Sequence, residues 1–385
     1  MSTSLRVLLV TEPGIDGVFR HVEVLTHYCL RQGVEVHLAY SDERGSGQLQ
    51  KLLQTVCEAG GETLNLRVGN APAARDLPAF LRLRAFARRL KPDVIHGHSS
   101  KAGALVRMLR WTGWRGPLFY SPQAYYGLAP RPSRMKTAFY NGLEKLFGGV
   151  GTTINISRDE AAFARTTLGI PEEKIRIIHN TVDTAAFAPA DAATRRRRRA
   201  EFGLPPDAVI PGFIGRSSFQ KDPQGLYRAV APVLAAHPEL VLFHVGQGEL
   251  DAELAALARD LGIAERIVRR PYLEEPAGFY EAIDALIVPS RYEAGWPIVT
   301  LEALACGLPV ISSIAPGTSD IAEGGLSHCW TARAEDVAGF TRGLEAWLAD
   351  RHAGRECNHR EIAIRRFSLE KCLGAVVAEY RKTLP

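Results

Sequence analysis

The run Pro289-Ser290-Arg291-Tyr292-Glu293-Ala294-Gly295-Trp296-Pro297-Ile298-Val299-Thr300-Leu301-Glu302-Ala303-Leu304-Ala305-Cys306-Gly307-Leu308-Pro309-Val310 contains a strand end, a glycine turn, a short helix and the start of a new strand. Pro297 suits the first helical turn, and Gly307 followed by Pro309 is typical of a helix stop. The pattern therefore predicts a helix over residues 297–306, in which only Thr300 and Glu302 are polar.

Glu302 lies one helical turn from both Ile298 and Ala305, on a face that we expect to be buried. A buried carboxylate needs hydrogen-bond donors. Either a structural partner supplies them, such as an arginine or backbone N–H groups, or the hydroxyl groups of a ligand do, with the helix N-terminus ready for a phosphate. The helix alone leaves both readings open.

The composition is that of a soluble globular protein, with 385 residues, 46% of them hydrophobic and 23% charged. This length predicts two domains of ordinary size. The apolar run at residues 7–10 is too short for a signal peptide or a membrane span, so we expect a cytoplasmic protein. Six scattered cysteines without a C-x-x-C pair argue against a zinc site and a disulfide framework.

Charge is unevenly distributed along the chain. The first 150 residues hold 20 Lys and Arg against 11 Asp and Glu, a formal net charge of +9, and the remainder carries −4. This asymmetry points to an anionic partner for the first half. Leucines interleave the basic residues of 82–91, so an amphipathic helix on an anionic membrane surface and a solvated helix face both remain open. No nucleic-acid-binding motif accompanies the basic residues.

Strands and helices alternate along the chain. Residues 5–11 read as a buried strand, followed by a glycine turn that includes Gly17, a helix and a second strand at residues 35–40. The turn lacks the full G-x-G-x-x-G fingerprint of dinucleotide-binding proteins. The same alternation of strands and helices begins again with a strand at residues 208–214. Pro211 lies inside this predicted strand, and a central strand rarely contains proline because proline has no N–H to donate to the neighbouring strand. We therefore predict two α/β domains with parallel sheets.

Polar residues follow several of these predicted strands, at the end where parallel sheets bind ligands. His96 and His98 close one strand, and Gln123 follows the next. After residue 214, Arg216 and Lys221 place two cations on one loop, which suits a diphosphate leaving group that gains charge as its bond breaks. The five arginines of residues 195–199 we expect to form a solvated charged segment.

The opening stretch resembles the E-x7-E signature of the retaining nucleotide-sugar glycosyltransferases called family 4. The matching residues are Ser290, Glu293, Gly295, Trp296, Glu302, Ala303, Ala305, Gly307, Pro309 and Val310. Eight residues, instead of seven, separate Glu293 from Glu302, and Pro297 stands where the family usually has its second glycine. Weaker similarity extends over almost the whole chain, including the second glycine turn at residues 316–320.

The resemblance implies the GT-B fold of two facing Rossmann-like domains. Residues 1–185 correspond to an acceptor-binding domain and residues 186–365 to a nucleotide-sugar-binding domain. Residues 366–385 correspond to a C-terminal helix that crosses back to the first domain.

Site residues follow from the same resemblance. Arg216 and Lys221 would hold the donor diphosphate together with helix N–H groups near Ile298 and Val299. Glu302 would hold the ribose, while Glu293 and Gly295 would lie at the donor sugar. From the first domain, Gln123 (in the place of a family histidine), His98 and Gly17 would face the sugar or the acceptor.

The implied activity is retaining transfer of a hexose from a nucleotide-diphosphate sugar to a glycan or a lipid-linked acceptor, in cell-surface polysaccharide synthesis on the inner membrane face. No cofactor besides the donor substrate is implied. The chain has no Asp-x-Asp and no His-Glu-x-x-His, so we expect no metal dependence. The alternatives are a nucleotide-sugar epimerase of the same fold and a non-catalytic nucleotide-sugar-binding protein.

Overall fold

The chain forms two compact units in a computed structural model, and each unit is built around its own parallel sheet. Unit 1 comprises the residues up to Asn180 together with those from Glu370 onward, and unit 2 comprises Thr181–Leu369. The structure describes residues 4–14, 16–129, 133–315, 317–322, 325–355 and 357–384.

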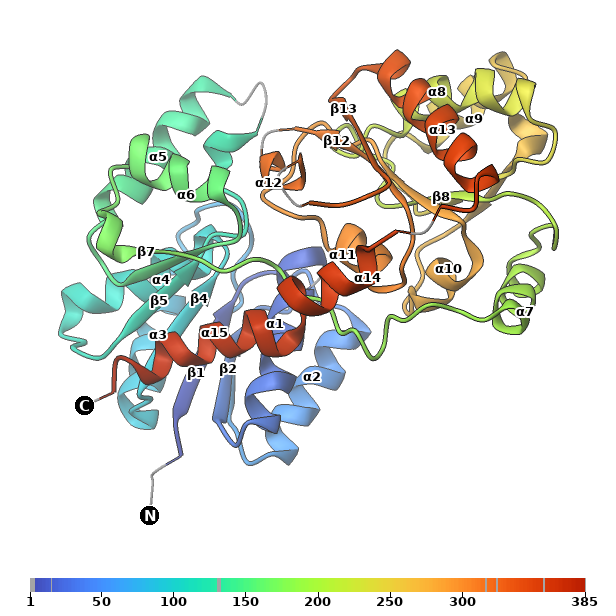
Figure 1. Ribbon diagram of the computed structural model, residues 1–385. Helices are drawn as coiled ribbons and strands as arrows, with labels where there is room; N and C mark the ends of the chain where they lie inside the picture. Colours follow the sequence, from blue (N-terminus) through green and yellow to red (C-terminus); the bar gives the residue numbers. More distant parts are fainter. Residues whose placement is uncertain are drawn as a thin grey trace. The chain divides into compact units, whose positions relative to one another are not determined.

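Unit 1 holds a seven-stranded sheet in the order β3-β2-β1-β4-β5-β6-β7, and every paired strand is parallel (Figure 1). Its strands are β1 (Arg6–Thr11), β2 (Glu35–Tyr40), β3 (Thr63–Asn65), β4 (Val94–His98), β5 (Leu118–Ser121), β6 (Thr152–Asn155) and β7 (Ile175–Ile177). The strand order reverses between β1 and β4. In open α/β sheets, ligands bind at the carboxyl ends of the strands beside such a reversal.

The helices of unit 1 pack on this sheet through apolar side chains such as Leu83 and Val106. They are α1 (Asp16–Arg31), α2 (Gly47–Glu58), α3 (Asp76–Leu90), α4 (Ser100–Met108), α5 (Arg134–Phe147), α6 (Arg158–Thr166) and α15 (Leu369–Arg381), with short 3-10 helices η1 (Leu109–Thr112), η2 (Tyr126–Leu128) and η3 (Glu172–Lys174). The C-terminal helix α15 is fixed to the sheet because the Tyr380 hydroxyl lies 2.6 Å from Nδ1 of His96 on β4. The last residues of the chain thus complete the first domain, as the family resemblance implied.

Unit 2 repeats the architecture with a six-stranded parallel sheet in the order β10-β9-β8-β11-β12-β13. Its strands are β8 (Pro211–Ile214), β9 (Leu242–Val245), β10 (Ile267–Arg270), β11 (Ala285–Val288), β12 (Val310–Ile314) and β13 (Cys329–Arg333). Here the order reverses between β8 and β11. Pro211 is tolerated in a central strand because it is the first residue of β8, a position where a missing N–H costs little.

The helices of unit 2 follow the strands in turn. They are α7 (Ala192–Phe202), α8 (Pro223–Ala236), α9 (Asp251–Asp260), α10 (Ala277–Ala282), α11 (Ile298–Ala305), α12 (Ser319–Ala322), α13 (Val337–His352) and α14 (His359–Ile362), with the 3-10 helix η4 (Ala264–Arg266) and the π-helix η5 (Ala363–Phe367). Helix α11 is the helix predicted at residues 297–306. No helix in the described ranges is both long enough and apolar enough to cross a membrane.

The arginine run on α7 corrects one prediction, because it is not uniformly solvated. Arg199 is buried, and its guanidinium lies 2.9 Å from the carboxylate of Asp284, which precedes β11. Arg195 contacts the same carboxylate at 3.0 Å. These two ion pairs fasten α7 to the sheet of unit 2, and Arg351 of α13 lies 3.3 Å from the same carboxylate. Asp284 lies 85 residues away from Arg199 along the chain.

Candidate functional site

Glu302 lies on α11 with its carboxylate buried, as its helical position predicted, and the residue is only 4% exposed. The hydroxyl of Tyr280, on α10, donates a 2.7 Å hydrogen bond to Oε2 of Glu302. A tyrosine hydroxyl therefore supplies one donor, where the sequence left an arginine, backbone N–H groups and the hydroxyl groups of a ligand open. Such a bond leaves a carboxylate with further acceptor capacity, since two oxygens offer about four lone-pair sites.

The loop after β8 carries Arg216 and Lys221 at the strand-order reversal of unit 2. Arg216 is exposed at the carboxyl end of β8. Asp222 replaces the glycine that the family usually has in this loop, and it adopts a left-handed conformation with φ 46°. Among residues other than glycine, Asp and Asn tolerate this conformation best. Asp222 also caps α8, since its side chain accepts from the N–H of Gly225 at 3.2 Å.

Four contacts join this loop to the stretch that follows β11. The N–H of Arg291 donates to the carbonyl of Gln220 at 2.8 Å, and the amide of Gln220 donates to the carbonyl of Tyr292 at 3.2 Å. The Arg291 guanidinium lies 2.8 Å from the carboxylate of Asp222.

The fourth contact is an ion pair between Nζ of Lys221 and Oε1 of Glu293, 2.5 Å apart. Two residues that the sequence singled out, 72 positions apart, thus meet directly. The Glu293 side chain is only 11% exposed. The loop that carries Arg216 and Lys221 and the acidic motif therefore form one assembly.

Glycines make the close backbone approaches around this assembly. A Cβ on Gly246 would lie 2.0 Å from the carbonyl oxygen of Gly215, and one on Gly248 would lie 2.3 Å from that of Ser217. Gly317, at φ 91°, belongs to the second glycine turn, and its Cβ would lie 1.6 Å from the carbonyl oxygen of Glu293. Pro316 of that turn lies outside the described residues.

The remaining motif residues surround the start of α11. Gly295 is buried, and Ile298 and Val299 form the first turn of the helix, where N–H groups have no partner inside the helix. The additional residue of the motif falls in the bend at residues 294–296, where Trp296 is fully buried against Phe367 with ring centroids 4.9 Å apart.

Two hydroxyl groups to which the sequence analysis assigned no role lie in the same stretch. Ser290 and Thr300 are buried, and neither hydroxyl has a hydrogen-bond partner among the described residues. The available signals were the match of Ser290 to the family motif and the place of Thr300 in an otherwise apolar helix.

In unit 1, His98 ends β4 beside Thr11 of β1, at the strand-order reversal. His98 is fully buried, and within the described ranges neither of its ring nitrogens has a hydrogen-bond partner. Burial lowers the pKa of His98 well below its ordinary value, and the neighbouring rings of His96 and His21 lower it further. His98 is therefore a neutral imidazole that can both donate and accept a hydrogen bond.

His96 differs from His98 because both of its nitrogens are engaged. Nδ1 lies 2.6 Å from the Tyr380 hydroxyl and Nε2 lies 2.9 Å from the Ser121 hydroxyl. The structure thus separates a structural histidine from a candidate ligand-binding one, although they are two residues apart on one strand.

Unusual backbone conformations follow the two adjacent strands β4 and β5. Ser99 has φ 83° and ψ 158°, and Gln123 has φ 61°. The side-chain nitrogen of Gln123 is buried and has no hydrogen-bond partner in the described part of the chain. Such strain concentrates at functional sites. Gly17 is exposed in the first turn of α1, and Ile15 of the same glycine turn lies outside the described residues.

Metal-ligating side chains do not cluster in the described ranges, where no group of three His, Cys, Asp or Glu residues is arranged to hold an ion. The two polar centres described above are therefore built from a lysine–glutamate pair, buried hydroxyls, an amide and a neutral imidazole.

Two family models match successive parts of the chain and together cover most of it. The model described as "Glycosyltransferase Family 4" matches residues 15–186, and that described as "Glycosyl transferases group 1" matches residues 194–365. Among curated relatives, the D-inositol 3-phosphate glycosyltransferase of Streptomyces bingchenggensis is 30% identical over 76% of this chain and 67% of its own length. D-inositol 3-phosphate glycosyltransferase 1 of Catenulispora acidiphila is 32% identical over 67% of this chain and 64% of its own length.

Solved structures share the fold at low sequence identity. Sucrose-phosphate synthase from Thermosynechococcus elongatus has a TM-score of 0.79 at 20% identity, covering 98% of both chains. Anabaena HepE, solved in complex with UDP-glucose, has a TM-score of 0.79 at 19% identity, covering 99% of this chain and 100% of its own. With two Rossmann-like domains of the GT-B type and these matches over nearly its whole length, the chain belongs to the family 4 glycosyltransferases.

Proposed function

We propose that the protein is a metal-independent, retaining glycosyltransferase that moves a hexose from a nucleotide-diphosphate sugar to a glycan or a lipid-linked acceptor. The observation that carries this proposal is the assembly of the Arg216–Lys221 loop with the Glu293 stretch in unit 2. The Lys221 cation contacts the stretch that leads into α11, and the first N–H groups of a helix suit phosphate oxygens. HepE, solved with UDP-glucose, supports a nucleotide sugar as donor.

In this proposal, Arg216 and Lys221 stabilise the diphosphate as its charge grows during bond cleavage. Glu302, oriented by Tyr280, accepts hydrogen bonds from the ribose hydroxyls. Glu293 is held by its ion pair with Lys221 and accepts a hydrogen bond from a hydroxyl group of the donor sugar. The leaving phosphate assists the acceptor hydroxyl on the same face of the sugar, which gives retention without a protein base.

Unit 1 supplies the acceptor side. His98 and Gln123 offer buried polar atoms with no partner in the described residues, and both are suited to hydroxyl groups of a sugar. Gly17, at the start of α1, leaves room for a ligand to approach the backbone.

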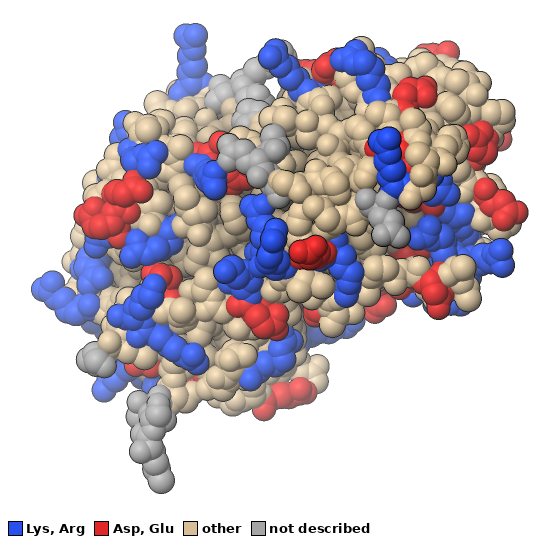
Figure 2. Space-filling model, viewed as in Figure 1, with Lys and Arg blue, Asp and Glu red and all other residues tan. Residues whose placement is uncertain are grey.

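The proposed setting is cell-surface polysaccharide synthesis on an anionic membrane surface. On the face drawn in Figure 2, Lys and Arg side chains are scattered over unit 1 among fewer Asp and Glu side chains. Helix α5 exposes Met135 (80%), Leu146 (60%) and Phe139 (49%), and its only acidic residue, Glu144, is buried against Arg107. Apolar side chains among cations favour anionic lipid. Failure to float with anionic liposomes would count against this setting.

A thermal-shift panel of UDP, GDP and ADP with their common sugars tests the donor site, because a ligand raises the melting temperature by mass action. We expect one nucleotide to stabilise the protein, and the shift to be lost in Glu302→Ala and Lys221→Ala. Arg259→Ala, an exposed arginine on α9, is the matched control. Full affinity in both test variants, with normal melting in the absence of ligand, would refute the site.

Activity assays then separate the alternatives. Donor consumption only with an acceptor, insensitive to EDTA and with retained anomeric configuration, is the expected result. Conversion of the donor to its epimer without acceptor identifies an epimerase instead, and an intact donor with every acceptor identifies a binding protein. The acceptor panel includes D-inositol 3-phosphate, the compound in the relatives' name, beside glycans and lipid-linked sugars.

A further inference from the structure

A second basic pocket lies in unit 1, at the opposite edge of the sheet from His98 and Gln123. It is lined by Arg84 and Arg88 of α3, by the loop at residues 112–116 and by Lys91-Pro92, which precedes β4. Gly116 precedes β5, so the pocket sits at the amino ends of these strands. At 3.3 Å per residue, the five residues of β4 separate the two places by roughly 15 Å.

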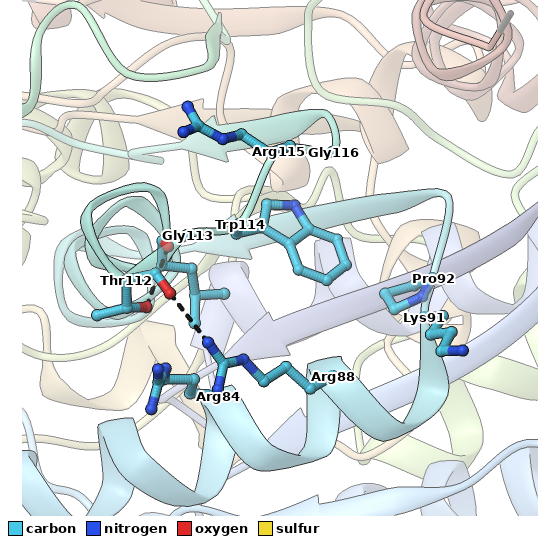
Figure 3. Close-up of a pocket in the computed structure, with 10 residues that line it drawn as sticks. Arg84, Arg88, Lys91, Pro92, Thr112, Gly113, Trp114, Arg115 and Gly116 are labelled. Carbon is cyan, nitrogen blue, oxygen red and sulfur yellow. Dashed lines mark hydrogen bonds between the residues drawn. The ribbon is translucent and has the colours of Figure 1, made fainter.

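Cations dominate the pocket. Among its ten lining residues, Arg84, Arg88, Lys91 and Arg115 are basic and none is acidic. In Figure 3, Arg84 and Arg88 extend from α3 toward the loop, with the Trp114 ring between them and Gly116, while Lys91 and Arg115 lie at its margins. Burial, and then the charge of Arg115, lowers the pKa of nearby Arg110. Four positive charges therefore line the pocket, and no acidic residue lines it to neutralise them.

Two N–H donors in the pocket are buried and have no acceptor among the described residues. They are Nε of Arg84 and Nε1 of Trp114. Buried donors are normally paired, and an unpaired one carries a desolvation penalty. Neighbouring groups are fixed by internal bonds: Arg88 donates to the carbonyl of Thr112 at 3.1 Å, and Arg110 donates to those of Trp114 and Gly116, each at 3.1 Å. The loop is therefore held in place beside α3 by these hydrogen bonds.

We propose that this pocket binds a phosphate monoester, with oxygens accepting from Arg84 and Trp114 and charge balanced by Arg88, Lys91 and Arg115. A phosphate monoester carries close to two negative charges and three acceptor oxygens, which suits several cations and two free donors better than a carboxylate does. The cavity, about 230 Å³, is smaller than the roughly 300–1,000 Å³ of pockets for drug-sized ligands. A phosphoryl group with a short substituent fits this volume.

The group has two chemical sources, a free phosphate ester and the headgroup of phosphatidic acid. Tryptophan labelled with ¹⁵N gives indole N–H signals for five residues, and Trp114→Phe assigns the one in the pocket. The titration uses protein whose proposed nucleotide site is saturated with nucleotide, or Lys221→Ala if no nucleotide binds. We expect added inorganic phosphate to shift the Trp114 signal until the shift reaches a plateau. Arg84→Gln and Arg88→Gln should each weaken binding about tenfold or more, and Arg259→Gln should not.

Flotation with vesicles separates the sources. Binding to phosphatidic acid vesicles over phosphatidylserine vesicles, lost in the Arg84→Gln Arg88→Gln double variant, identifies the lipid headgroup. A Trp114 shift with phosphate and no such flotation identifies a free ester. The proposal is overturned if phosphate does not shift the Trp114 signal and phosphatidic acid vesicles do not float the protein. It is also overturned if the double variant, with an unchanged melting temperature, shows the same shift and the same flotation as the parent protein. Because the readout is Trp114, it does not depend on the donor site.

Discussion

Substituting Gly317 by alanine is expected to damage the proposed donor site without touching any proposed ligand contact. The added Cβ would lie 1.6 Å from the carbonyl oxygen of Glu293, whereas real Cβ contacts are essentially never closer than 3.0 Å. Either the glycine turn or the Glu293 backbone must therefore move by at least 1.4 Å, the difference between these distances. Such a displacement is more than half of the 2.5 Å separation of Lys221 and Glu293, so it is enough to disturb their contact.

The magnitude has two parts. Gly317 has φ 91°, so alanine adds a backbone penalty of about 1–2 kcal/mol. Gly262 provides the matched control, because it has φ 67° and its Cβ would meet nothing within 4 Å. The difference between the two variants isolates the collision with Glu293. A 1 Å misplacement of a reacting group can cost roughly a hundredfold in rate, so we expect kcat/KM to fall by about that factor in Gly317→Ala.

The measurement compares kcat/KM and the melting temperature of Gly317→Ala, Gly262→Ala and the parent protein, with the donor identified by the nucleotide panel. Gly262→Ala should lose stability only, with activity within about twofold of the parent. If Gly317→Ala and Gly262→Ala show equal stability and equal kcat/KM, the packing of this turn against Glu293 has no role in the site, and the argument fails.

Three further predictions concern stability. Burial raises the pKa of Glu160 from 4.5 to about 8. Between these pH values the carboxyl group ionises only in the unfolded state, so the free energy of unfolding should fall as pH rises. In urea unfolding, Glu160→Gln should be as stable as the parent near pH 4.5 and more stable at pH 8 by on the order of 5 kcal/mol. Burial lowers the pKa of His21 to about 4, so stability should also fall as pH drops from 6.5 to 4, where only the unfolded state gains the proton, and His21→Gln should flatten this slope. Asp222→Ala removes a helix cap and a residue that tolerates φ 46°, so it should lower the free energy of unfolding by roughly 1–3 kcal/mol in denaturant unfolding. Asp222→Gly should lower it less, because glycine adopts this φ without strain. Equal losses in the two variants would contradict the strain argument.

Much of the fold could be predicted because the relevant signals are local. Continuous apolar runs mark strands buried on both faces, and glycine and proline mark where helices stop. Helix α11 was located to within one residue at each end from Pro297 and Gly307. The resemblance of residues 302–310 then led to the family and to the GT-B architecture.

The partners of the site residues could not be predicted in the same way. Tyr280 carries no sequence signal that assigns it to Glu302, 22 residues away. Asp222 looked like a loss of the family's glycine, and only its backbone conformation accounts for an aspartate there. The buried arginine of α7 was missed because a run of like charges gives no hint of a distant carboxylate.

The sequence by itself determined the order of strands and helices along the chain and the division into two domains, since these depend on periodicity and turn residues that neighbours in the chain supply. Its resemblance to a known motif indicated the family. The tertiary structure alone decided which polar groups are engaged. His96 and His98 read alike in the sequence, yet His96 is saturated by Tyr380, 284 residues away, while the nitrogens of His98 have no partner in the described residues. Hydrogen bonds and ion pairs are short-range contacts, so they are fixed only when folding brings distant segments within about 3 Å of each other.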